Sequence, residues 1–308
     1  MSRKNGKNSV KIMNKSAGYT LFSLASPKKT IPLIGKIHTV DEAGAENMEF
    51  QVKCKCGSPI SIREEDVFSE IRCPFCGKSY LLSELDEELY QLYYSRRKAE
   101  FEISNQSIRK YSGAGGKVVI PNDVFFVSDR AFARNGSVEN VVCQSLKNIG
   151  NEAFANCTGL KEIVFADGLE SIGASAFGGC RSLGKVNFPA SVTLVDEEAF
   201  VNCKGITEVT FARGSKATIG KSAFEGCEKI AEIKLRDGMR VGERAFADCE
   251  NLDKVVIDGV VSLKDGAFAD CGRLTVYVTC KKGLVAPKWF NSKAFGKHTK
   301  IVWNYKEA

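Results

Sequence analysis

The sequence predicts an α/β repeat solenoid, in which a parallel β-sheet is backed by short helical or 3₁₀ turns, preceded by a small β-type zinc-binding unit. Two observations lead to this prediction. The dipeptide Ala-Phe returns along the C-terminal two-thirds of the 308-residue chain at a nearly constant interval. Ahead of these repeats, four cysteines fall in two short pairs. Self-similarity at a period of about 20 to 50 residues is typical of solenoids and related arrays.

Each repeat is marked by the phenylalanine of its Ala-Phe pair, and the intervals between these residues are 22, 23, 23, 24, 22, 22 and 27. An aliphatic residue stands five positions before the phenylalanine and another six positions after it, as Ile149 and Leu160 do around Phe154. At the ninth and eleventh positions the apolar spacing changes to the period of two that predicts a strand, as in Ile163 and Phe165. The marker phenylalanines are Phe132, Phe154, Phe177, Phe200, Phe224, Phe246, Phe268 and Phe295.

A single repeat cannot enclose its own apolar residues, so parallel copies must stack and bury each column against the next copy. The Ile-x-Phe stretch then adds one strand to a parallel sheet, and the Ala-Phe segment forms the helical or 3₁₀ turn behind it. The alanine keeps this turn close to the strand, and the phenylalanine fills the centre of the coil.

A column of cysteines stands three residues after the phenylalanine. In a tight buried turn, cysteine is a small apolar residue. Alternatively, thiols of neighbouring coils could pair as disulfides or hold a metal. The column comprises Cys157, Cys180, Cys203, Cys227, Cys249 and Cys271.

The pattern Ile-Gly-x-x-Ala-Phe-x-x-Cys-x-x-Leu-x-x-Ile-x-Phe, intact over residues 149–165, resembles the BspA-like leucine-rich repeat. The resemblance extends over about residues 100–303 and implies a curved solenoid used for protein binding, often on bacterial surfaces. Both end units depart from the pattern. Asn135 replaces the first cysteine, and the last strand, with Val276 and Val278, is shifted by one residue. Atypical end units are what a capped solenoid requires.

The candidate metal ligands are Cys54, Cys56, Cys73 and Cys76. The pairs read Cys-Lys-Cys-Gly and Cys-Pro-Phe-Cys-Gly and are separated by sixteen residues. Four thiolates in two pairs can surround one Zn²⁺ tetrahedrally and leave no position for a substrate, so we expect one structural zinc ion. Over about residues 48–82 the sequence resembles a zinc ribbon, although the first pair is one residue shorter than the usual Cys-x-x-Cys. A redox dithiol and free structural thiols are the alternatives.

Charge is concentrated at the N-terminus, where residues 1–40 carry eight basic residues and no acid, against a net +7 for the whole chain. Such an arm attracts polyanions or simply remains solvated. Ser83 and the acidic turn that follows it predict a helix that caps the solenoid. The expected organisation is a flexible basic arm over 1–47, a zinc ribbon over 48–82, a capping helix over 83–99, a solenoid over 100–303 and a tail over 304–308.

No catalytic residues are expected. The two histidines, His38 and His298, lie in no recognisable motif, and no phosphate-binding loop or nucleophile elbow is present. No apolar run is long enough to span a membrane, and the short apolar patch Leu21–Ala25 does not suffice for a signal peptide. Twelve cysteines without a signal peptide indicate a reducing cytoplasm.

A non-enzymatic scaffold that recognises a protein partner is the function expected from these features. The side chains eight and ten positions after each phenylalanine should face away from the core. A solvated face whose charges only pair across strands is the alternative for this surface. The alternative function is nucleic-acid association through residues 1–40 and the zinc ribbon. The predicted partner-binding residues are Glu162, Lys185, Asn187, Glu208, Thr210, Glu232, Lys234 and Lys254.

Overall fold

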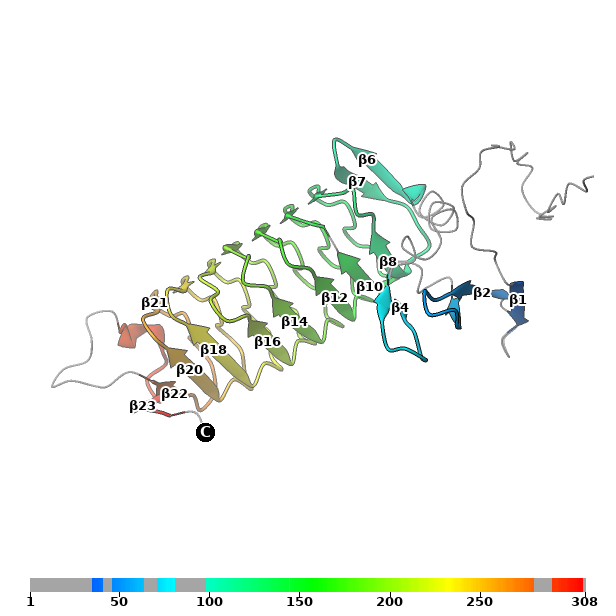
Figure 1. Ribbon diagram of the computed structural model, residues 1–308. Coiled ribbons are helices and arrows are strands. Elements are labelled where there is room, and N and C mark those ends of the chain that lie inside the picture. The colour runs from blue at the N-terminus through cyan, green and yellow to red at the C-terminus, as the bar shows by residue number, and fades with distance from the viewer. Residues whose placement is uncertain are drawn as a thin grey trace, which may run out of the picture.

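The computed structural model describes residues 35–40, 46–63, 71–80, 98–143, 145–279 and 290–306, which form a small N-terminal β unit and a solenoid (Figure 1). In the N-terminal unit, β1 (Gly35–Val40), β2 (Glu46–Lys53) and β3 (Pro59–Arg63) pair antiparallel, as do β4 (Ile71–Arg72) and β5 (Ser79–Tyr80). β1 falls within the stretch expected to form the basic arm. Residues 1–34 of that arm and most of the expected helix over 83–99 lie outside the described residues.

A long-strand sheet runs along one side of the solenoid, and all of its strand pairs are parallel. It consists of a five-stranded segment, ordered β16-β14-β12-β10-β8, and a four-stranded segment, ordered β18-β20-β22-β23. Its strands are β8 (Gly116–Ile120), β10 (Val138–Cys143), β12 (Glu162–Phe165), β14 (Lys185–Phe188), β16 (Glu208–Phe211), β18 (Glu232–Arg236), β20 (Lys254–Asp258), β22 (Thr275–Val278) and β23 (Lys300–Trp303).

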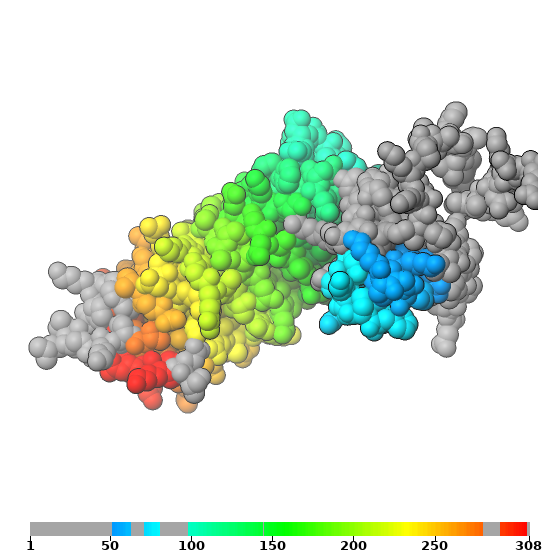
Figure 2. All heavy atoms as spheres, viewed as in Figure 1, coloured from blue at the N-terminus to red at the C-terminus, as the bar shows by residue number. Residues whose placement is uncertain are grey.

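A second sheet of short strands lies across the coil from the first, and its pairs are parallel except for the terminal hairpin β6–β7. Figure 2 shows the coils as successive bands of colour along an elongated body. The strands of this sheet are β6 (Phe101–Ser104), β7 (Ser107–Tyr111), β9 (Phe126–Val127), β11 (Asn148–Ile149), β13 (Ser171–Ile172), β15 (Leu194–Val195), β17 (Thr218–Ile219), β19 (Arg240–Val241) and β21 (Ser262–Leu263).

The predicted strand segments are confirmed, and their alternation decides which side chains are buried. In β14, Val186 and Phe188 are buried, whereas Lys185 and Asn187 are exposed. Side chains on a strand point alternately to the two faces of the sheet, so each Ile-x-Phe pair enters the core and the residues beside it face outward. One parallel sheet thus presents a polar outer face above an apolar inner face.

Stacked phenylalanine rings form the centre of the solenoid. Ring centroids from Phe132 to Phe295 follow one another at 4.5 to 5.3 Å, with planes tilted by 1° to 19°. The rings of Phe154 to Phe268 are fully buried. Strands in a sheet are about 4.7–4.9 Å apart, so the rings and the backbone ladders share one period.

The Ala-Phe segments differ from the expected helical or 3₁₀ turns. The predicted repeat solenoid is present as a β-solenoid of about eight coils with almost no helix, so the α/β description fits it only loosely. In the coil of Phe154, alternate amides close turns onto the third residue before them, and the amides between, such as that of Phe154, donate to the next coil. Glu152 and Asn156, with φ of 53° and 58°, adopt left-handed backbone conformations that interrupt a helix. Only the last coil has the expected 3₁₀ helix, η2 (Ser292–Ala294), among the described residues of 100–306.

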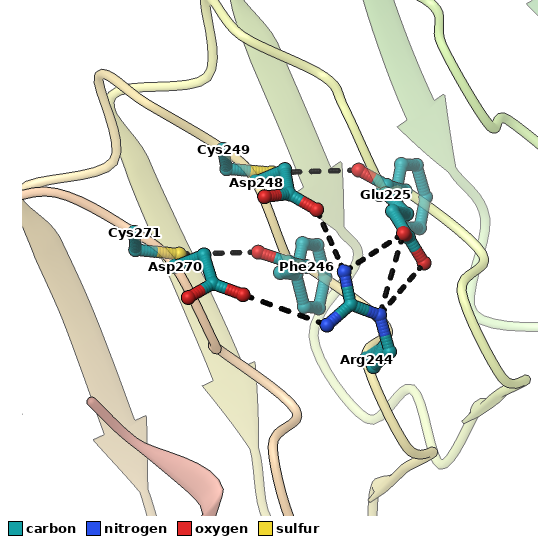
Figure 3. Close-up of polar contacts among 8 residues, drawn as sticks. Glu225, Arg244, Phe246, Asp248, Cys249, Asp270 and Cys271 are labelled. Carbon is teal, nitrogen blue, oxygen red and sulfur yellow. Dashed lines mark hydrogen bonds and ion pairs between the residues drawn. The ribbon is translucent and has the colours of Figure 1, made fainter.

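The cysteine column is a ladder of free thiols, five of them buried and Cys271 half-buried, as the interpretation as a packing column predicts. Each Sγ lies 3.0 to 3.4 Å from the carbonyl oxygen of the phenylalanine in the preceding coil, as Cys271 does over Phe246 (Figure 3). The thiol donates a hydrogen bond to that carbonyl. Burial raises the pKa of Cys157 and of Cys271 to about 12 and also raises that of Cys227 and Cys249, so these thiols remain protonated. The column therefore links successive coils.

Glycine follows the short strand in several coils because the neighbouring coil is too close for a side chain. A Cβ on Gly150 would lie 2.5 Å from Asp129 Oδ1 and 2.7 Å from the Asp129 nitrogen, and a Cβ on Gly242 would lie 2.7 Å from the Gly220 carbonyl carbon. These glycines thus permit the close stacking of coils.

Different aromatic contacts close the two ends of the ring stack. At the N-terminal end, Tyr111 stacks on Phe132 at 4.8 Å, and Phe101 packs on Tyr111 at 5.2 Å from the hairpin β6–β7. At the C-terminal end, Phe290 lies 5.8 Å from Phe295 and 4.9 Å from Trp303. The atypical end units expected from the sequence therefore supply rings that extend the central stack.

We predict that Phe200→Ala lowers the free energy of unfolding by about 3–5 kcal/mol, because the buried ring leaves a cavity between the rings of Phe177 and Phe224. Urea unfolding followed by circular dichroism measures the loss. Phe126→Ala is the matched control, since Phe126 is 39% exposed on a short strand and its removal should change stability little. Equal losses in the two variants would contradict the central role of the stack.

Candidate metal centre and outer strand face

The four candidate ligands lie on two turns of the N-terminal unit. The first turn follows β2, where the Cys54 amide donates to the Ser58 carbonyl and the Gly57 amide to the Cys54 carbonyl, both at 2.8 Å. The second turn lies between β4 and β5, where the Gly77 amide donates to the Cys73 carbonyl at 3.0 Å. Gly57 and Gly77 have φ of 92° and 70°, conformations that few other residues adopt without strain. The glycine after each pair thus permits the turn.

All four sulfur atoms converge within 4.8 Å of one another. Sγ of Cys54 is 3.6 Å from that of Cys76, and Sγ of Cys56 is 3.9 Å from that of Cys73. Cys54 and Cys73 are buried, whereas Cys56 and Cys76 are exposed. The short first pair therefore reaches the same point as the second, and its one missing residue does not prevent convergence.

Local donors favour a thiolate at this cluster. The Cys56 amide, 3.4 Å from the Cys54 sulfur, and the Tyr80 hydroxyl, 3.5 Å from it, lower the pKa of Cys54 to about 6. The Lys78 amide lowers the pKa of Cys76, but desolvation and the neighbouring thiols outweigh it and raise that pKa to about 11. Four thiols so close together cannot all ionise unless a cation lies among them.

This donor set suits a tetrahedral thiophilic ion. Sulfur-only sites select Zn²⁺ or iron–sulfur clusters, and four cysteines on two turns are the usual structural zinc arrangement. Two basic side chains lie beside the cysteine turns. Arg72 Nε donates to the Gly77 carbonyl at 3.2 Å, and Lys55 Nζ lies 5.6 Å from the centre of the Tyr80 ring. Such cations would partly offset the negative charge that four thiolates leave around a divalent ion.

The outer strand face contains the eight predicted partner-binding residues. Lys234 and Lys254 are half-buried and the other six are exposed, so all eight lie at the surface on the long strands. Lys185 Nζ is 2.8 Å from Glu208, Lys254 Nζ is 3.0 Å from Glu232, and the Thr210 hydroxyl donates to Asn187 at 2.6 Å. The cross-strand charge pairing considered as an alternative is therefore present for four of these residues, and Asn187 and Thr210 add a neutral hydrogen bond across strands.

Tertiary structure changes the apolar part of this face. Val256, expected to face outward, is fully buried, in register between Lys234 and Tyr277. Val164 is 46% exposed and is paired in register with Val142. Tyr277 faces outward because the last strand is shifted by one residue, and its ring lies 4.7 Å from that of Tyr305. The shifted strand, already visible in the sequence, is the signal that could have identified Tyr277.

Between β16 and β18 the long-strand sheet has no regular ladder, although both strands are described. Arg236 Nε donates to the Phe211 carbonyl at 2.9 Å and bridges this interruption. β16 and β18 belong to the repeats of Phe200 and Phe224, which are 24 residues apart, the longest interval between marker phenylalanines before the last one. The sequence indicates an insertion there but not the side chain that compensates for it.

A cluster of ion pairs on the turn side joins three coils (Figure 3). Arg244 Nη2 is 2.9 Å from Glu225 and 2.7 Å from Asp248, and Nη1 is 3.5 Å from Asp270. The hydrogen bond from Arg244 lowers the pKa of Glu225, and the same bond raises the pKa of Arg244. One guanidinium thus ties together the carboxylates of successive turns.

Two surface hollows of the described residues are lined by no recognisable catalytic group. One, of about 450 Å³, is lined by Arg130, Arg134, Glu152 and Asn156 with two alanines. Within it, Arg130 and Glu152 form an ion pair with each other. The other, of about 380 Å³, follows the short strands β9 to β15. No described helix is long and apolar enough to cross a membrane.

Stacked coils, a buried phenylalanine column and a parallel sheet with a polar outer face define a leucine-rich-repeat solenoid. The family model for the BspA type leucine rich repeat region matches six copies over residues 84–207 and 147–275. These matches span more than half of the chain, and the chain belongs to the BspA type leucine-rich-repeat family. This fold is generally a non-catalytic scaffold that binds proteins.

Solved structures of this kind are similar to the chain. A leucine-rich repeat protein of T. pallidum is 28% identical, with 58% of this chain and 83% of that one covered and a TM-score of 0.42. The pneumococcal vaccine antigen PcpA is 18% identical, with 67% and 46% covered and a TM-score of 0.45. A leucine-rich repeat protein of Bacteroides ovatus is 17% identical, with 66% and 74% covered and a TM-score of 0.33. No curated protein matches the chain.

We predict that the Arg244–Glu225 pair contributes a coupling free energy of roughly 1 kcal/mol and the Lys185–Glu208 pair less, because the first is less exposed and is part of a network. Double-mutant cycles with alanine, read by urea unfolding, measure both. The pKa of Glu225 is lowered by folding, so its coupling should be complete above its ordinary value of 4.5 and lost as the pH falls through the lower folded value. A coupling that persists in strong acid would contradict this assignment.

Proposed function

We propose that the protein is a non-enzymatic scaffold that binds a protein partner on the outer strand face and carries one structural zinc ion at its N-terminal unit. The observation that carries the first part is the long-strand sheet itself. Its parallel strands hold a row of outward side chains over buried residues such as Val186 and Phe188. A rigid surface loses little conformational entropy when a partner binds, which favours recognition there.

The chemistry of this face suits a protein partner. Its lysines are balanced by glutamates on the neighbouring strands, as Lys185 is by Glu208, so the face offers no continuous positive charge for a phosphate backbone. Exposed ion pairs are weak and exchange partners at little cost. Val164 adds an exposed apolar side chain beside these charges. Mixed polar and apolar contacts of this kind are typical of non-obligate protein interfaces.

The zinc proposal rests on the convergence of Cys54, Cys56, Cys73 and Cys76. When bound, the ion would hold the two cysteine turns together. Few apolar side chains support these turns, because the described buried residues of the unit lie mainly on its strands. All four ligand positions are filled by protein, which is the arrangement of a structural site.

A reducing compartment remains part of this proposal. Six column thiols donate hydrogen bonds to carbonyl oxygens, and only a reduced thiol can donate in this way. Such a compartment would also keep the four candidate ligands available for metal.

Purified protein should contain one zinc per chain, measured by inductively coupled plasma mass spectrometry after expression without chelators. The double variant Cys73→Ser, Cys76→Ser should lose it, because two of the four thiolates are missing. Cys271→Ser is the control, since this column residue is remote from the cluster in sequence and its removal should leave the zinc content unchanged. Protein without zinc, or a double variant that retains it, would refute the metal assignment.

Reversing both charges in Glu208→Lys, Glu232→Lys should weaken partner binding at least tenfold, since both residues lie centrally on the outer strand face. Quantitative pull-down from native lysate, followed by titration of the recovered partner, measures this. The matched control is Glu197→Lys, Glu228→Lys, which also reverses two carboxylates in inter-coil ion pairs, with Lys221 and Lys204, but away from the strand face.

Deleting residues 1–34 leaves β1 in place and should alter mainly the association rate. Salt screens exposed charges over about 8 Å at physiological ionic strength, so an arm that only steers encounter contributes little to the final affinity. If the deletion abolishes binding, and the affinity for DNA or RNA falls steeply with salt, the nucleic-acid alternative is correct instead.

A further inference from the structure

The described cysteines fall into two environments with opposite reactivity. The six column thiols and Cys143 are buried or half-buried, and burial raises the pKa of Cys143 above its ordinary range. At the proposed metal centre, Cys56 and Cys76 are exposed. Oxidants react with accessible thiolates, and a bound zinc ion would keep Cys56 and Cys76 as thiolates, so the proposed metal centre is the accessible oxidation site among the described cysteines.

We propose that Cys56 and Cys76 form a reversible oxidation site, at which peroxide converts the four metal ligands into two disulfides and releases the zinc ion. This inference rests on the proposed zinc centre. It assigns a modification to residues that the scaffold function does not use, and it names hydrogen peroxide as the oxidant.

The geometry selects the disulfides. Each exposed sulfur has a buried partner on the other turn, since Cys76 lies 3.6 Å from Cys54 and Cys56 lies 3.9 Å from Cys73. A sulfur oxidised at the surface therefore has a resolving thiolate beside it. A disulfide needs sulfur atoms about 2.0 Å apart, so modest side-chain movement suffices for both pairs. The expected products are Cys54–Cys76 and Cys56–Cys73, which join the two turns.

The chemistry balances with two peroxide molecules. The Cys76 thiolate attacks one peroxide oxygen, the O–O bond breaks, and the hydroxide that leaves takes up a proton, so that the sulfur becomes a sulfenic acid. The Cys54 thiolate then attacks this sulfur, the S–O bond breaks, and a second hydroxide is protonated to water. Cys56 and Cys73 consume the second peroxide in the same way. The zinc ion keeps its oxidation state and dissociates because disulfide sulfurs carry no negative charge.

The solenoid should not respond to this chemistry. Its six column thiols are hydrogen-bonded between coils, and the marker rings from Phe154 to Phe268 are fully buried. Loss of zinc would therefore alter the N-terminal unit while the outer strand face keeps its shape. Oxidation thus changes one part of the chain and leaves the other intact.

The test uses the full chain after metal analysis has shown one zinc per molecule. Hydrogen peroxide is titrated in, and released zinc is followed by the absorbance of 4-(2-pyridylazo)resorcinol. We expect one zinc released for every two peroxides consumed, with recovery after dithiothreitol and zinc are added. Trypsin cuts after Lys55, between Cys54 and Cys56, and chymotrypsin cuts after Phe75, between Cys73 and Cys76. Each cysteine then lies on its own peptide, so mass spectrometry can identify which cysteines are joined by disulfides.

Cys271→Ser is the matched control, since it removes the half-buried column thiol and should leave zinc release unchanged. Retention of zinc at these peroxide levels, a Cys73–Cys76 disulfide as the main product, or earlier oxidation of column thiols would overturn the proposal. A starting protein without zinc would instead refute the metal assignment, so the two failures are distinguishable.

Discussion

The stacking of one phenylalanine ring per coil is the contact on which the rest of the solenoid depends. Rings at 4.5 to 5.3 Å have nearly the spacing of hydrogen-bonded strands, so the ring column and both backbone ladders can be satisfied by the same translation. A coil that moved out of this period would lose a ring contact and two ladders together. The narrow spacing also leaves no room for a Cβ at positions such as Gly150.

The same translation organises the surface. Residues at equivalent positions of neighbouring coils lie side by side, so a charged side chain lies next to the side chain at the same position of the next repeat. Arg130 with Glu152, Lys185 with Glu208, and Lys254 with Glu232 are all pairs of this kind. Each pair is individually weak. The two pairs on the long strands leave a face of mixed charge there, and this is the surface proposed to bind a protein partner.

The N-terminal unit and the solenoid achieve order by different means. The solenoid buries columns of apolar residues and needs no ligand, whereas the small unit brings four sulfurs to one point and has only short strands around them. A unit of this size lacks the buried surface to be stable by packing alone. Under our proposals, its stability would depend on metal and on the oxidation state of exposed cysteines, while that of the solenoid would not.

The sequence by itself determined the repeat, the long strands and the buried phenylalanine and cysteine columns, because each follows from spacing within one repeat. It also determined the grouping of four cysteines, which follows from their spacing ahead of the repeats. Only the tertiary structure decided the left-handed turns at residues such as Glu152 and the burial of Val256. It also decided the bridging of β16 and β18 by Arg236. The physical reason is that these features depend on contacts with the neighbouring coil, one full repeat away, which no local pattern specifies.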